Sequence, residues 1–241
     1  MRSANSRQRP DGGLSKRSST PARLITVLRM KLTHNLTFGL CIAHATVLIS
    51  GAAGSELPSP WKHQDIGAVQ VKGDASLNQG VFTVRGTLDT WGTNDGFHFV
   101  WQPMRGDGEI MARVLTVENT FNHAKGGIMF RETLTADSKH AEACVTPVDG
   151  TQFLVRRDTG GKTTSAHTGR DKAKLPYWVK LVRAGEKFSG YESSDGNAWN
   201  LIGATNVLMK PEIYVGLVTS SHAKEKLCTA TIDSVSIKPK P

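Results

Sequence analysis

Beyond residue 56 the chain is a series of short apolar or alternating runs separated by turn sequences. Alternation of apolar and polar residues with a period of two is typical of strands that have one buried face. The intervening Gly and Asp residues tolerate the positive φ angles that close hairpins. No useful length of this region has the apolar spacing of a helix. The pattern predicts strands at 66–71, 81–85, 96–102, 109–117, 125–132, 141–146, 151–157, 177–183, 187–193, 199–205, 213–220 and 227–237.

So many strands without crossover helices predict an all-β fold, in which two antiparallel sheets pack face to face. No linker divides residues 56–241, which we therefore expect to form one domain. Alternation places the aromatic residues of 97–101 on one face, which we expect to be core. The turn at Ser193-x-Asp195-Gly196-x-x-Trp199 resembles an Asp-box, in which Asp caps loop amides, Gly is left-handed and Trp packs beneath the hairpin.

The first 55 residues are different in character. They hold eight basic residues and one acidic residue, and so carry most of the net charge of +9. The apolar run 36–49, followed by the small residues 51–55, predicts a signal peptide at 30–55. Residues 1–29 read as a disordered basic leader, and Met30 is an alternative start to Met1. An uncleaved anchor is the other interpretation of the apolar run.

A signal peptide implies a secreted, periplasmic or cell-surface protein. Because the basic charge lies in the leader, we expect no nucleic-acid partner, and no membrane partner beyond the signal segment. Export would also allow a disulfide between Cys144 and Cys228, which lie 84 residues apart. The alternative is that both are small buried apolar residues.

Several segments carry a family resemblance, in order along residues 58–237. They are Pro-Trp-Lys-His-Gln-Asp-Ile-Gly at 60–67, Thr-Trp-Gly-Thr-Asn-Asp-Gly-Phe-His-Phe-Val at 90–100, and the segments 106–114, 124–132, 175–183 and 214–222. The chain resembles concanavalin A-like lectin/glucanase β-sandwich modules of secreted bacterial proteins, in the group related to the enolase-regulation-type domain of unknown function. The resemblance implies a jelly-roll sandwich and a carbohydrate-binding role, without a settled activity.

Sugars are held by flat aromatic faces together with polar side chains that satisfy their hydroxyl groups. Alternation places Gln152 with Arg156 on one strand, and Trp178 with Lys180 on another. We predict that these residues and Arg131 converge on a concave sheet face, and that Trp91 is a separate candidate at the rim. The alternative is an ordinary solvated face of long polar side chains.

Catalytic patterns are absent from the sequence. No strand carries the Glu-x-Asp-x-x-Glu or Glu-x-Asp-x-Glu run of laminarinase-type enzymes, and the nearest acidic pairs, Asp107/Glu109 and Asp89/Asp95, have no specific spacing. There is no Gly-x-Ser-x-Gly elbow, and the histidines after residue 56 are scattered singly. We therefore expect a non-catalytic carbohydrate-binding module. The alternatives are a structural or protein-interaction sandwich and a glycoside hydrolase-like enzyme.

The resemblance also implies one structural calcium, since such jelly rolls often clamp their first and last strands with this ion. Asp65 and Asp233 stand near those two ends. Calcium takes six to eight oxygen ligands, of which these carboxylates would supply a part. The alternative is that both side chains hold turns.

Overall fold

The computed structural model describes residues 56–169 and 173–240, so the predictions for 1–29 and 30–55 lie outside it. Its elements are all strands, and no helix in the described ranges is long and apolar enough to cross a membrane. The strands are β1 (Lys62–Ile66), β2 (Asp74–Asn78), β3 (Val81–Gly86), β4 (Phe97–Arg105), β5 (Gly108–Val117), β6 (Lys125–Arg131), β7 (His140–Val145), β8 (Thr151–Arg156), β9 (Thr164–His167), β10 (Tyr177–Ala184), β11 (Lys187–Ser193), β12 (Asn200–Asn206), β13 (Glu212–Ser220) and β14 (Cys228–Pro239).

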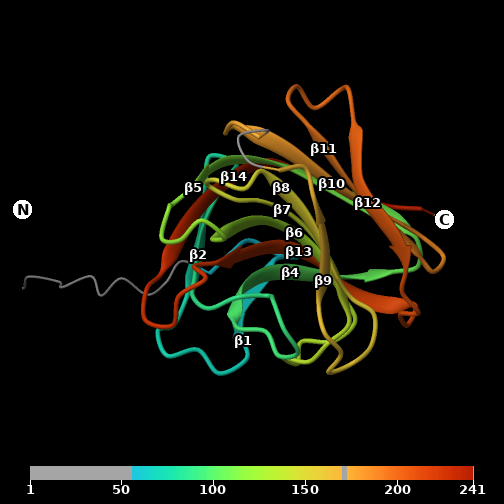
Figure 1. Cartoon of the computed structure of the whole chain (residues 1–241), viewed down its shortest axis with the longest axis horizontal. Helices are drawn as coiled ribbons and strands as arrows, with labels where there is room; N and C mark the ends of the chain where they lie inside the picture. The colour runs from blue at the N-terminus through green and yellow to red at the C-terminus, as the bar shows by residue number, and fades with distance from the viewer. Residues whose placement is uncertain (1–55, 170–172, 241) are drawn as a thin grey trace, which may run out of the picture. The chain divides into compact units, whose positions relative to one another are not determined.

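The strands form two antiparallel seven-stranded sheets, which confirms the predicted all-β sandwich. One sheet has the order β1-β4-β13-β6-β7-β8-β9, and the other β12-β11-β10-β5-β14-β3-β2. Figure 1 shows the two sheets bowed in the same sense, one nested within the other. We call the sheet that contains β4, β6 and β13 the inner sheet and the other the outer sheet. The face of the inner sheet that points away from the outer sheet is its concave face.

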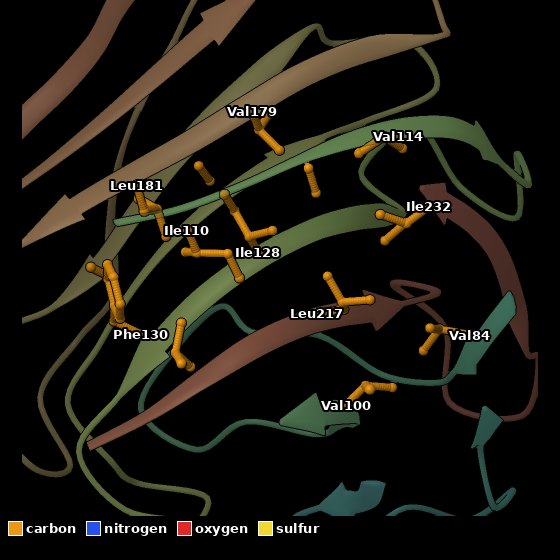
Figure 2. Close-up of a cluster of buried hydrophobic side chains, with 14 of the residues drawn as sticks. Val84, Val100, Ile110, Val114, Ile128, Phe130, Val179, Leu181, Leu217 and Ile232 are labelled. Carbon is orange, nitrogen blue, oxygen red and sulfur yellow. The ribbon is translucent and has the colours of Figure 1, made fainter. Parts of the chain in front are cut away.

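The main core lies between the sheets and follows the predicted alternation. Ile128 and Phe130 of β6 point toward Val179 and Leu181 of β10, and all four side chains are fully buried (Figure 2). Phe97, Phe99 and Trp101 are buried as predicted. They belong instead to a second apolar cluster, with Ile66, Met129 and Val218. The inner sheet is therefore buried on both faces over much of its area.

The observed strands differ most from the predicted ones at β1, β2 and β9. The first strand is β1 at Lys62–Ile66 rather than 66–71, because Gly67 at φ 75° turns the chain out of the sheet. Strands β2 and β9 were missed. The edge strand β9 has four residues, three of them exposed, so it lacks the apolar alternation on which the prediction depends.

The hairpin after β11 confirms the capping roles predicted for two residues. The Asp195 Oδ1 atom accepts hydrogen bonds from the Asn197 and Ala198 amides at 2.8 and 2.9 Å, and Gly196 has φ 76°. The ring beneath Gly196 is that of Trp178, where an added Cβ would meet the indole at 2.8 Å. The hairpin is therefore packed against β10.

The predicted disulfide is wrong, because Cys144 and Cys228 are both free and buried. Cys228, on β14, belongs to the core between the sheets. Cys144, on β7, alternates with the core residues Ala143 and Val145 and so projects from the concave face. The two thiols lie on opposite sides of the inner sheet, and the alternative of two buried small residues holds.

Leu181→Ala is expected to lower the free energy of unfolding by about 2–5 kcal/mol, because it leaves a cavity in the main core. The matched control is Leu201→Ala on β12 of the same sheet, whose side chain is 57% exposed. We expect the control to change stability by less than about 0.5 kcal/mol. Urea unfolding followed by tryptophan fluorescence measures both. Equal losses would contradict the assignment of the core.

Candidate functional site

The register of the inner sheet aligns polar residues on its concave face. Arg131 on β6 pairs with His140 on β7, and His140 pairs with Arg156 on β8. Paired residues of neighbouring strands point to the same face. Two steps farther along β7 and β8 the pair is Glu142 and Leu154, and then Cys144 and Gln152. Beside the second apolar cluster, the concave face therefore carries a row of mostly polar residues on β6, β7 and β8.

The loop 87–96 between β3 and β4 is bound to this face through Asp95. The Asp95 carboxylate accepts a hydrogen bond from Arg131 Nη1 at 2.5 Å, and from Arg156 Nη2 and Nη1 at 2.5 and 2.9 Å. Arg156 also donates to the Gly92 carbonyl at 3.1 Å. All three charged side chains are completely buried. We call Asp95, Arg131, Arg156 and His140 the buried charge cluster.

Two opposing effects act on the charge of Asp95. Burial raises the pKa of its carboxyl, but the neighbouring His140, Arg131 and Arg156 outweigh burial, and the pKa of Asp95 lies well below its usual range. Asp95 is therefore an anion held by two guanidinium groups. It follows that Arg131 and Arg156 hold the loop and are closed to a ligand, contrary to the sequence-based prediction.

Beside the buried charge cluster the concave face opens into a cleft of about 470 Å³. Its walls come from the loop 87–96, from the segments next to β6 and β13, and from strands β6, β8 and β9. The lining residues are Asp89, Trp91, His123, Lys125, Gln152, Ser165, His167 and His222.

Asp89 is the most connected side chain of the cleft. Its Oδ1 atom accepts hydrogen bonds from Lys125 Nζ at 2.5 Å and from the Thr90 amide at 2.8 Å, and its Oδ2 atom lies 2.6 Å from His222 Nδ1. Burial raises the pKa of Asp89, but the contacts with His222 and Lys125 lower it by more. Asp89 is therefore ionised, and both of its oxygens are occupied.

A second histidine–carboxylate pair lies at the mouth of the cleft, where His123 Nδ1 is 3.0 Å from Asp149 Oδ2. The centroids of the His123 and His222 rings are 5.4 Å apart. Phe121 stacks on His222 at 4.6 Å and is 48% exposed, and Trp91 is 51% exposed. The mouth therefore combines paired imidazoles with exposed aromatic rings.

Two further titratable groups on the same face of β7, Glu142 and Cys144, are completely buried and interact electrostatically with Lys125. Burial raises the pKa of Glu142 to about 7, against the opposing effect of the Lys125 ammonium. Burial also raises the pKa of the Cys144 thiol, and the Glu142 carboxyl adds to this effect. Glu142 therefore keeps its proton to a higher pH than an exposed glutamate does, and the Cys144 thiol is protonated.

The predicted binding residues lie in three places: Arg131 and Arg156 in the buried charge cluster, two residues in the cleft, and two on the outer sheet. Gln152 and Trp91 line the cleft together. Trp178 and Lys180 lie on β10 of the outer sheet, where Arg113 covers the Trp178 ring at 5.7 Å and Lys180 Nζ lies 4.1 Å from the Trp199 ring centroid. The predicted convergence of these two with Gln152 is wrong, because alternation fixes the face of a strand but not the sheet to which the strand belongs.

The sequence did not predict that Lys125, His222 and His167 line one cleft, because pairing between distant strands brings them together. Lys125 pairs with Ser220 across β6 and β13, which brings His222 beside it from almost a hundred residues away. Gln152 pairs with His167 across β8 and β9. The only signal in the sequence was the alternation that places Lys125 on the same face as Arg131.

The two carboxylates proposed for calcium lie on different sheets and bind protein donors. Asp65 on β1 accepts from the Gly73 amide at 3.0 Å and lies 2.7 Å from His98 Nδ1. Asp233 on β14 pairs with Arg113 at 2.6 Å. Within residues 56–169 and 173–240 no three His, Cys, Asp or Glu side chains are grouped to hold a metal ion. The calcium clamp stays a prediction.

The structure is similar to that of a functionally unknown protein from Saccharomyces cerevisiae, at 15% identity over 74% of this chain and 97% of the other, with a TM-score of 0.59. It is also similar to a mutant of the GH43 protein BlXynB from Bacillus licheniformis, at 13% identity over 74% of this chain and 39% of the other, with a TM-score of 0.51. No family model and no curated protein matches the sequence. The likenesses and the topology identify the fold as a concanavalin A-like β-sandwich.

Asp95→Ala is expected to lower the free energy of unfolding by about 3–5 kcal/mol, because it leaves two buried guanidinium groups without their anion. The control is Asp74→Ala, which removes an exposed pair with Arg85 and should cost about 0–1 kcal/mol. Because folding lowers the pKa of Asp95, the stabilisation is present above its unfolded pKa of about 4 and is lost as the pH falls. Chemical denaturation at pH 7 and pH 3 measures both effects, and equal losses at pH 7 would contradict the anchoring role.

Glu142→Gln is expected to change how stability depends on pH. Folding raises the pKa of Glu142 from 4.5 to about 7, so the folded state keeps a proton that the unfolded state loses within this interval. The wild type should therefore lose on the order of 3 kcal/mol of stability between about pH 4.5 and 7 from this group. The glutamine variant should lack this slope in urea unfolding curves. A slope unchanged by the substitution would show that Glu142 ionises normally.

Proposed function

We propose that the chain is an exported carbohydrate-binding protein whose saccharide ligand occupies the cleft. The observation that carries the proposal is the position of Trp91, whose ring is half exposed at the edge of a polar concave cavity. An aromatic face packs against the C–H patches of a sugar ring, while neighbouring polar groups bind the hydroxyls.

The polar groups that such a ligand needs are present and uncommitted. Among the described residues, the side chains of Gln152, Ser165 and His167 make no hydrogen bond with one another or with the rest of the chain, and all three line the cleft. Together they offer an amide, a hydroxyl and an imidazole, each able to donate and to accept. They come from adjacent strands β8 and β9, so the sheet fixes their relative positions.

The rigidity of the cleft also supports a binding role. Trp91 lies on the loop 87–96, which Asp95 fixes to the sheet and whose Gly92 carbonyl accepts from both Arg156 and Thr163. A ligand that stacks on Trp91 would therefore meet a ring whose backbone is already ordered, so binding costs little conformational entropy. Export rests on the predicted signal peptide at 30–55.

Trp91→Ala is expected to weaken saccharide binding at least tenfold, because it removes a stacking platform worth about 1.5 kcal/mol or more. A glycan array with the wild type identifies the ligand, and calorimetry measures its affinity. The matched control is Trp178→Ala on the outer sheet, which should bind like the wild type. Equal weakening by both variants would remove the cleft as the binding site. An array on which the wild type binds no saccharide would overturn the function itself.

A further inference from the structure

The cleft contains two histidine–aspartate pairs of the kind that orient an imidazole for proton transfer. In His222 the Nδ1 atom is 2.6 Å from Asp89, and in His123 it is 3.0 Å from Asp149. A carboxylate this close to Nδ1 favours the proton on that nitrogen, which places the lone pair of the neutral ring on Nε2. No described residue hydrogen-bonds to either Nε2 atom, so both are available to a bound molecule.

The spacing of the two rings suits a substrate that gives a proton to one and takes a proton from the other. Their centroids are 5.4 Å apart, and both rings line the same cavity. A neutral imidazole accepts a proton at Nε2 and an imidazolium donates one there, so the pair can act as general base and general acid. Binding alone does not require two carboxylate-oriented imidazoles.

The other cleft residues can stabilise negative charge on a substrate. The Lys125 ammonium has three N–H donors, of which one binds Asp89 and a second the His123 carbonyl. No described residue accepts a hydrogen bond from its third donor or from the Gln152 amide, and both residues line the cleft. A cation and an amide beside an acid–base pair fit a substrate whose carboxylate gains charge during reaction.

The same residues disfavour hydrolysis by paired carboxylates. Such hydrolysis needs two accessible acids on either side of the glycosidic bond. Asp89 has both oxygens occupied, Asp95 is enclosed by two arginines, and Glu142 is completely buried. The chemistry left to the cleft is acid–base catalysis, in which the two imidazoles exchange protons with a bound substrate.

We propose that this cleft cleaves a uronate-containing polysaccharide by β-elimination, an inference that rests on the proposed saccharide binding. One imidazole Nε2 removes the proton at C5, next to the carboxylate that Lys125 and Gln152 bind. The electron pair of the C5–H bond forms the C4–C5 double bond, and the bond from C4 to the leaving oxygen breaks. The imidazolium of the other histidine protonates that oxygen, and exchange with water restores both rings. No water is added, and no oxidant, reductant or cofactor is consumed.

The experiment incubates the whole chain with oligogalacturonate, oligomannuronate and oligoglucuronate, and follows the ultraviolet absorbance of the conjugated double bond. The wild type should generate the unsaturated product from at least one of them. His222→Ala and His123→Ala should each lower kcat at least ~100-fold while keeping the affinity for the oligosaccharide within a few-fold. Added imidazole should restore part of the lost rate. The matched control, His63→Ala, removes an exposed imidazole on β1 outside the cleft and should leave the rate unchanged.

The outcomes separate this inference from the proposed function. Saccharide binding at the cleft without an unsaturated product from any of the three uronates would overturn the elimination and leave the binding function intact. Absence of binding to any saccharide would overturn both. Product formation that His222→Ala and His123→Ala leave unchanged would show that the paired imidazoles are not the acid and base.

Discussion

The ion pairs between Asp95 and the two arginines are the interaction on which the functional surface depends. Three completely buried charged groups meet on the concave face of the inner sheet, where a bare sheet would otherwise face water. Burying these charges is unfavourable unless each is paired and hydrogen-bonded, so moving the loop 87–96 off the sheet would leave two buried guanidinium groups without their anion. The loop covers part of the concave face, and its residues Asp89 and Trp91 form one wall of the cleft beside it.

The two-sheet fold leaves one face of the inner sheet available for the residues that anchor the loop. The main core between the sheets uses one face of β6, β7 and β8, and this leaves the opposite face of the same strands free to carry polar residues. Because antiparallel register is fixed by the buried face, the polar residues fall into rows such as Arg131, His140 and Arg156. The packing of the apolar core therefore fixes the register, and the register fixes the geometry of the charged residues on the opposite face of the inner sheet.

The fold could be predicted further than the site, for a physical reason. Alternation and turn residues are local, so they predicted the strands and the face on which Gln152, Arg131 and Arg156 lie. Pairing between distant strands is not local, and the sequence carried no sign that β10 joins the outer sheet while β8 joins the inner one. Trp178 was therefore grouped with Gln152 wrongly. The buried Asp95 was noticed only as one member of an acidic pair with Asp89, since nothing in its sequence neighbours shows that two arginines from other strands would enclose it.

Asp89 connects the anchored loop to the chemistry of the cleft. It lies six residues before Asp95 on the same loop, and its carboxylate binds both Lys125 of β6 and His222 after β13. The loop is thus attached to the sheet at two points, one completely buried and one at the cleft. Since the Asp89 contact also orients the His222 ring, the position of the imidazole depends on the loop being in place. The buried ion pairs of Asp95, which no ligand can reach, therefore help to position the His222 ring, which lines the cleft.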